Sequence, residues 1–167
     1  MQRRLYQELL WVLLGYVIAV LIAAAVAVVP IALKEALSSP GMAAEQGGFL
    51  PYFFSLYFLG TIIAAMLMAI SAWPGFVIAL IVGVRRGYRS PKYFSGCGLA
   101  AAFLGALVFR GVPPDAWGPG SAWFGTSYLI DILGACLGGA AGGFAYGLFA
   151  RRYQVFLRPL VKAEVFD

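Results

Sequence analysis

The chain contains no histidine, only two cysteines and few charged residues. Of its 167 residues, 12 are Lys or Arg, 7 are Asp or Glu, and none is His. The absence of histidine excludes bis-histidine haem, histidine-ligated zinc, copper or iron, and any nucleophile that depends on a histidine base. Cys97 and Cys136 are too few for a structural zinc site, and we expect both as small packing residues. No metal site is expected.

Charged residues make up only 11% of the chain, whereas hydrophobic residues make up 62%. Soluble domains carry roughly 25% charged residues, so this chain cannot cover a surface that faces water. Its mean hydropathy is +0.88. We therefore expect an integral membrane protein that is embedded in, and in contact with, the lipid bilayer.

Four long apolar runs predict an all-α, polytopic membrane protein with four transmembrane helices in a single domain, 1–167. The predicted spans are 5–33, 50–84, 93–109 and 123–150. The first run is much longer than the apolar core of about 7–15 residues in a secretory signal, which favours an uncleaved span. Pro30 should bend or end this helix. The polar and Gly-rich stretch 34–48 is expected to be a loop.

The second apolar run, 50–84, is unusually long, since a straight helix of that length measures about 50 Å and the hydrocarbon core about 30 Å. Pro74-Gly75 interrupts it. Three interpretations are open: a tilted helix kinked at Pro74, a protruding aromatic first part, or two short re-entrant pieces. We favour the kinked span, because Ala72-Trp73 offers no polar turn residues. Its first turns carry aromatic side chains suited to a membrane interface, namely Tyr52, Phe53, Phe54, Tyr57 and Phe58.

Basic residues concentrate on one side of the four-span arrangement. Ten fall there: Arg3, Arg4, Arg85, Arg86, Arg89, Lys92, Arg151, Arg152, Arg158 and Lys162. Only Lys34 and Arg110 fall on the other side. By the positive-inside rule, both termini should be cytoplasmic. Since topology already accounts for the placement of these charges, we expect no nucleic-acid partner.

The last predicted span contains a glycine-rich stretch, DILGACLGGAAGGFAYG, at 131–147. On a helix its glycines form two ladders of i, i+4 spacing: Gly134, Gly138 and Gly142, then Gly139, Gly143 and Gly147. Small-xxx-small ladders mark close helix contacts in membranes, and this face is wide enough for two neighbours. Gly98 and Gly105 give the third span a similar stripe. The ladders can serve packing within the protein, or an intermolecular or cofactor surface.

Asp131 and Arg110 are the candidate intramembrane charges. Both are expected near the non-cytoplasmic boundary, where a structural ion pair between spans three and four is the first interpretation. The alternatives are a substrate or proton role for Asp131, or simple solvation at the interface.

The end of the last span, GGAAGGFAYGLFARR, together with the Trp-Pro-Gly break in the second, resembles small four-helix bacterial inner-membrane proteins of unassigned function. The resemblance implies four spans and a multi-pass protein of the bacterial inner (cytoplasmic) membrane. It carries no active-site residue to this chain.

No P-loop, GxSxG, CxxC or HExxH motif occurs, and no catalytic residue is expected. The sequence thus favours a non-catalytic accessory or structural subunit of a larger energy-transducing or transport complex, with other membrane subunits as partners. The alternative is a small homo-oligomeric channel or transporter lined near Asp131 and Pro74. An enzyme is not expected, and bound lipid is the one cofactor class left open.

Overall fold

The computed structural model describes residues 2–86, 90–110 and 128–153, and for several residues near helix ends it describes the backbone alone. Helices account for nearly all of these ranges, and no strand occurs in them. The helices are α1 (Gln2–Ser38), α2 (Pro40–Glu45), α3 (Phe49–Ser71), α4 (Trp73–Arg86), α5 (Pro91–Arg110) and α6 (Tyr128–Tyr153). The all-α prediction is therefore confirmed.

Three helices are long and apolar enough to cross a membrane, where the sequence predicts four spans. The candidate segments are Leu10–Ser38, Phe49–Ser71 and Ile132–Arg151. The helix α5 is not among them, and α4 contributes only a short apolar stretch, Trp73–Gly83. The chain is thus a helical protein suited to a membrane, with three candidate spans among the described residues.

The first helix is longer than predicted. It has 37 residues and continues through Pro30 to Ser38, so the expectation that Pro30 could end the helix is wrong. A proline inside a helix removes one backbone hydrogen bond, a loss that surrounding helices compensate in membrane proteins.

The predicted loop at 34–48 is also mostly helical. It consists of the last turn of α1, the short helix α2, and a turn at Gly47 and Gly48. Both glycines have positive φ, 84° and 122°, which side chains other than glycine rarely adopt. This turn reverses the chain into α3.

The long second apolar run divides into two helices at Ala72. The Ala72 N–H donates to the Met68 carbonyl at 2.9 Å, and the Phe76 N–H donates to the Ala72 carbonyl at 2.9 Å. Pro74 therefore lies in the first turn of α4, where its missing N–H costs least. The kink expected at Pro74 takes the form of a helix break two residues earlier.

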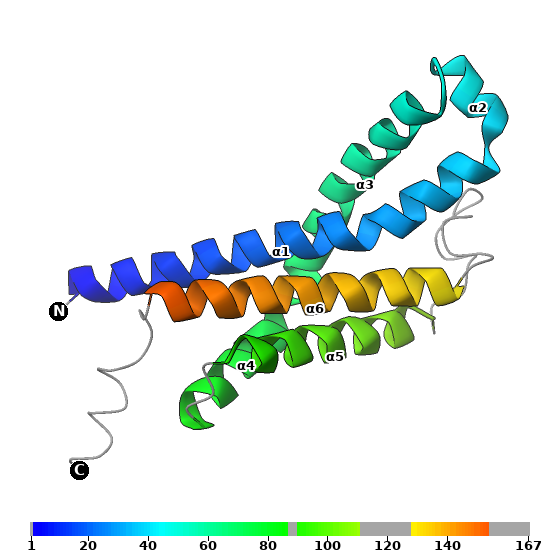
Figure 1. Ribbon diagram of the computed structural model, residues 1–167. Helices are drawn as coiled ribbons and strands as arrows, with labels where there is room; N and C mark the ends of the chain where they lie inside the picture. Colours follow the sequence, from blue (N-terminus) through cyan, green and yellow to red (C-terminus); the bar gives the residue numbers. More distant parts are fainter. Residues whose placement is uncertain (1, 87–89, 111–127, 154–167) are drawn as a thin grey trace, which may run out of the picture.

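The helices α1, α6 and α5 lie side by side, with α6 in contact with both of the others (Figure 1). α3 leans away from them toward the turn at α2, and its main contact among the described helices is with α1. Most of the buried apolar residues are alanines, eight of them in α1, α2 and α4. Small side chains let the helix axes approach closely, so the core is thin and extends along the helices.

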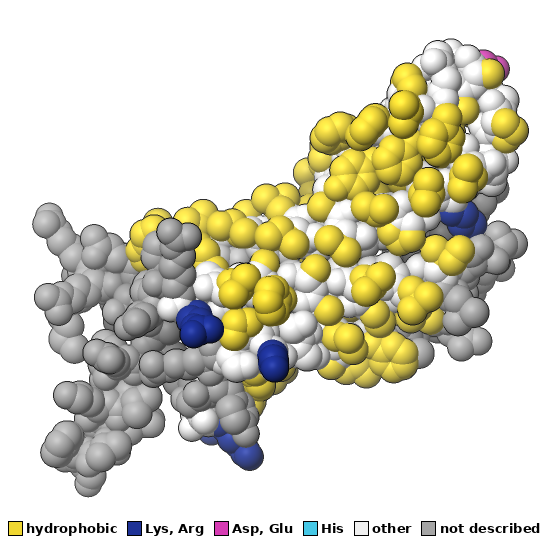
Figure 2. Space-filling view, in the orientation of Figure 1, with side chains coloured by type: hydrophobic (Ala, Val, Ile, Leu, Met, Phe, Trp, Pro, Cys, Tyr) yellow, Lys and Arg dark blue, Asp and Glu magenta, His cyan; other side chains and the backbone are white. Residues whose placement is uncertain are grey.

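Charged side chains mark the two ends of this bundle. Arg85, Arg86, Lys92 and Arg151 are all exposed, at the end of α4, the start of α5 and the end of α6. Figure 2 shows Lys and Arg gathered mainly at that end, with apolar side chains over the visible face between the ends. Glu35 and Glu45 lie at the opposite end, on α1 and α2.

Candidate functional site

The first glycine ladder of α6 packs against α1. A Cβ atom built on Gly142 would lie 2.6 Å from the Ala19 carbonyl oxygen, and one on Gly138 would lie 2.5 Å from that of Ala23. At Gly134 the corresponding distance to the Ala27 carbonyl oxygen is 2.9 Å. The two helices therefore run antiparallel with one register through three successive contacts, which span about two turns. Only a hydrogen atom fits between the backbones at these positions.

The second ladder of α6 packs against α5. A Cβ atom on Gly139 would clash with the Gly98 carbonyl oxygen, and one on Gly98 would clash with that of Gly139. Gly143 faces the Phe94 carbonyl in the same way. One turn later a Cβ on Gly147 would lie 2.5 Å from Pro91 Cα. At the α5–α6 contact the glycine hydrogens therefore point at carbonyl oxygens of the neighbouring helix. In this arrangement weak Cα–H···O contacts add to the packing.

One further bond joins α5 to α6. The Ser95 hydroxyl donates to the Ala140 carbonyl at 3.0 Å, between the two glycine contacts. All six glycines at 134–147 are thus engaged within the chain, on two neighbours rather than one. The ladders therefore serve packing within the protein.

Gly105 behaves differently from the other predicted packing glycines. A Cβ atom there meets no described atom within 4 Å. Its position on α5 is therefore not one that close contact restricts to glycine.

Sequence reasoning missed the partner ladder in α1. Gly15, Ala19, Ala23 and Ala27 follow the same i, i+4 spacing and face α6. A Cβ on Gly15 would lie 2.8 Å from a ring carbon of Phe149, so this fourth position is also tightly packed. The sequence does contain this small-xxx-small spacing, but the surrounding run is so rich in alanine and valine that the spacing does not stand out.

The bulky face of α6 points away from both neighbours. Leu133 and Leu137 are 60% and 61% exposed, and Phe144 and Leu148 are also exposed. This is the arrangement expected of a helix with glycine on the protein side and large apolar residues on the lipid side.

Aromatic rings fill the space beside the break between α3 and α4. Tyr16 of α1 contacts Trp73 and Phe76, with ring centroids 5.1 and 4.6 Å apart. Phe76 in turn meets Tyr146 of α6 edge-on at 4.8 Å, and Tyr146 meets Phe94 of α5 at 5.1 Å. This aromatic cluster joins four helices, which no pattern in the sequence indicated.

Two tyrosine hydroxyls bond to backbone carbonyls at the same level. The Tyr16 hydroxyl donates to the Ala69 carbonyl at 2.7 Å, in the last turn of α3. The Tyr93 hydroxyl donates to the Ala79 carbonyl of α4 at 3.1 Å. Carbonyls near the end of a helix lack some of their usual intrahelical partners. Tyr16 therefore stabilises α3 where the helix ends.

Two other hydroxyls are buried without a described partner. Tyr146 is only 3% exposed, and its hydroxyl oxygen has no hydrogen bond to any described residue. The Thr61 hydroxyl of α3 is in the same situation. A buried hydroxyl without a partner costs roughly 1–3 kcal/mol.

The predicted interfacial aromatics divide into inward and outward members. Tyr52 is buried against Ala36 and Ala43, and Phe53 packs on the same cluster. Phe54 and Phe58 are 50% and 63% exposed. The rings also contact one another along the helix, as in the stacked pair Phe53 and Tyr57. Only part of the aromatic set is therefore available to lipid or a partner.

The side chains of Asp131 and Arg110 lie outside the described residues, so the predicted ion pair stays a prediction. Cys97 and Cys136 are free, partly buried thiols. Among the described residues, no group of three or more acidic, cysteine or histidine side chains could hold a metal ion.

Comparison with protein-family models, with curated proteins and with solved structures found no match. The site is therefore characterised by its geometry alone. It consists of a rigid three-helix interface of α1, α6 and α5, joined by the aromatic cluster to the break between α3 and α4. Such an arrangement can hold helices in a set geometry, and its described members include no nucleophile paired with a base.

Proposed function

We propose that the protein is a non-catalytic accessory subunit of a larger assembly in the bacterial inner membrane, and that α3 is the helix that contacts its partner. The observation that carries this proposal is the exposure of α3. Only 6% of its most apolar 18-residue window is buried, against 39% for α1 and 28% for α6. Of the three candidate spans, α3 is thus the one that its own chain covers least.

The exposed face of α3 is continuous and rich in large side chains. Phe54, Phe58, Ile62 and Met66 follow one another at i, i+4 spacing, and each is at least half exposed. Large contiguous apolar patches with this spacing are typical of helix-in-groove contacts. Lipid can also cover this face. A protein partner that co-purifies with the chain distinguishes the two cases.

The rest of the proposed arrangement is a fourth span at α5 with cytoplasmic termini. α5 packs antiparallel to α6 from Pro91 to Ala102, through the glycine contacts given above. A helix held this closely against a span lies at the same depth of the bilayer. The basic residues at the ends of α4 and α6 and at the start of α5 support a cytoplasmic location for that end.

The test is co-purification of the protein from its own membrane in mild detergent, followed by native mass measurement. We expect a stoichiometric membrane partner with the unchanged protein. Phe54→Ala with Phe58→Ala should release that partner, because both rings point outward, while the variant still inserts and folds.

Phe53→Ala is the matched control. Phe53 packs on the cluster of Ala36, Ala43 and Tyr52, so its loss should lower the stability of the α2–α3 turn and leave the partner bound. Recovery of the unchanged protein as a monomer without partner would contradict the proposal. A homo-oligomer would favour the channel or transporter alternative.

A further inference from the structure

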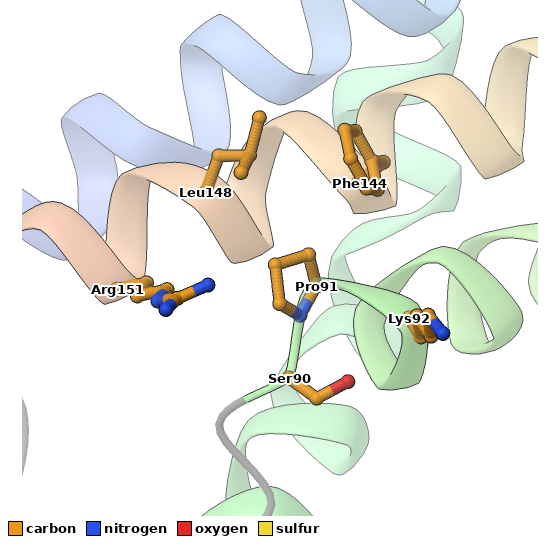
Figure 3. A pocket seen from close by; sticks show the side chains of 6 residues that line it. All are labelled: Ser90, Pro91, Lys92, Phe144, Leu148 and Arg151. Atoms are coloured by element: carbon orange, nitrogen blue, oxygen red, sulfur yellow. The ribbon is translucent and has the colours of Figure 1, made fainter.

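A groove lies at the cytoplasmic end proposed above, between the start of α5 and the end of α6. It has a volume of about 620 Å³ and is lined by Ser90, Pro91, Lys92, Phe144, Leu148 and Arg151. Figure 3 shows Lys92 and Arg151 on opposite sides of Pro91, with Phe144 and Leu148 on the α6 side above it. Beside the groove the two helices approach closely, since a Cβ atom on Gly147 would lie 2.5 Å from Pro91 Cα.

The polar part of the groove is cationic. Lys92 and Arg151 are exposed, and neither has an ion pair with any described residue. None of the described residues that line the groove is acidic. Two basic side chains that flank a groove between membrane helices, at the cytoplasmic level, form the arrangement that recognises anionic lipid headgroups.

The apolar part of the groove continues toward the membrane interior. Phe144 and Leu148 are 46% and 47% exposed and lie one turn apart on α6. They belong to the bulky face of α6, which continues to Leu137 and Leu133. A ligand that fits both parts must have an anionic head and an apolar chain of several carbons. A free phosphate ion would use only the cationic half.

We propose that this groove binds one anionic phospholipid, with its phosphodiester between Lys92 and Arg151 and an acyl chain along Phe144 and Leu148. The start of α5 at Pro91 places the positive end of that helix beside the phosphate. The lipid would then hold the ends of α5 and α6 together from the outside, as the glycine contacts hold them from within. This inference does not depend on the protein having a partner subunit.

The test uses the full-length protein in detergent with added lipid, and native mass measurement to count the lipid molecules that stay bound. Phosphatidylglycerol is compared with phosphatidylcholine of the same acyl chains. The unchanged protein should retain one phosphatidylglycerol in clear preference to phosphatidylcholine. Lys92→Gln with Arg151→Gln should weaken that binding roughly 30-fold, since each cation near an anionic lipid contributes about fivefold.

Arg85→Gln with Arg86→Gln is the matched control. It removes the same charge from the same end of the molecule, at two exposed residues outside the groove. The control should retain phosphatidylglycerol as the unchanged protein does. Equal loss in both double variants would overturn the proposal, because it would mean diffuse attraction rather than a site. Equal retention of the two lipids by the unchanged protein would overturn it as well.

Two further measurements separate the lipid from a free anion and from a folding defect. Glycerol phosphate should fail to displace phosphatidylglycerol, and displacement at similar concentrations would show that the acyl chain is not recognised. Leu148→Ser should weaken retention of phosphatidylglycerol while the cations remain. Circular dichroism on each variant identifies any that is unfolded, and Lys92→Arg with Arg151→Lys then serves as the charge-preserving replacement, which must retain the lipid.

Discussion

The glycines of α6 lie in close contact with two neighbouring helices. The effect of replacing a glycine on the stability of the protein depends on which atoms face it. At Gly142 the α1 backbone leaves no room for a methyl group, whereas at Gly105 no described atom lies within 4 Å of the position a methyl group would take. Elsewhere in a helix, alanine is preferred to glycine by about 1 kcal/mol. The same substitution should therefore have opposite effects at the two positions.

We expect Gly142→Ala to lower the free energy of unfolding by about 1–2 kcal/mol, because overpacking of the α1–α6 contact outweighs the gain in helix propensity. Gly105→Ala, the control, should be neutral or stabilising by up to about 1 kcal/mol. Unfolding in mixed micelles with increasing dodecyl sulfate, followed by circular dichroism, measures both. A stabilised Gly142→Ala protein would show that α1 and α6 are not in this close contact.

The two buried tyrosines near the helix break offer a second comparison at single residues. The Tyr16 hydroxyl donates to the Ala69 carbonyl, whereas the Tyr146 hydroxyl has no described acceptor. Tyr16→Phe should therefore destabilise the protein by about 1 kcal/mol, the net value of one hydrogen bond. Tyr146→Phe should be neutral or stabilising, since it removes a buried group without a partner. The same unfolding assay decides, and a larger loss for Tyr146→Phe would reveal a partner for its hydroxyl.

At the scale of whole helices, the break at Ala72 lets one apolar run pack against two different helices. α3 packs on α1, through contacts such as Gly60 against Val28, while α4 turns toward α5, where Ala79 accepts the Tyr93 bond. A straight helix over the same residues could not follow both directions. The aromatic cluster fills the space that the change of direction creates.

We expect Pro74→Ala to join α3 and α4 into a more continuous helix, because the new N–H can donate to the Ile70 carbonyl. Amide hydrogen exchange around 70–76 should slow roughly fivefold, in line with about 1 kcal/mol for one added hydrogen bond. Pro30→Ala is the control: α1 already continues through Pro30, and exchange at 70–76 should not change. Unchanged exchange in Pro74→Ala would mean that the aromatic cluster, and not the proline, sets the break.

At the scale of the whole molecule, the distribution of charge predicts one orientation. Reporters fused after Asp167 and placed within 85–92 should both read cytoplasmic, and a reporter within 112–120 should read outside. The physical reason is the cost of moving clustered Arg and Lys across the membrane. A C-terminus outside the membrane would contradict the four-span arrangement and would remove the cytoplasmic setting of the lipid groove.

The sequence by itself determined the helical class, the suitability for a membrane and the main apolar segments. Low charge and runs of more than 20 apolar residues follow from composition and local order, and they require no knowledge of neighbours. The spacing of the α6 glycines likewise indicated a helix with one bare face, because i, i+4 periodicity is a local property.

Only the tertiary structure decided which neighbour each glycine meets. The first ladder contacts α1 and the second contacts α5, while Gly105 contacts nothing described. A small-residue stripe has the same appearance in sequence whether or not another helix covers it, since its energy lies in contacts between distant segments. The same reason explains the unexpected aromatic cluster of Tyr16, Phe76, Phe94 and Tyr146, whose members come from four helices.

The groove beside Pro91 also exists only in three dimensions. Lys92 and Arg151 are 59 positions apart in the chain and come to line the same groove through the antiparallel contact of Pro91 with Gly147. The number of basic residues on one side of the membrane can be predicted from the sequence, because this prediction requires only the order of the spans. The close approach of α5 and α6 determines which two of these basic residues flank the apolar groove. That approach depends on the glycines at 139, 143 and 147 and on the residues that they contact.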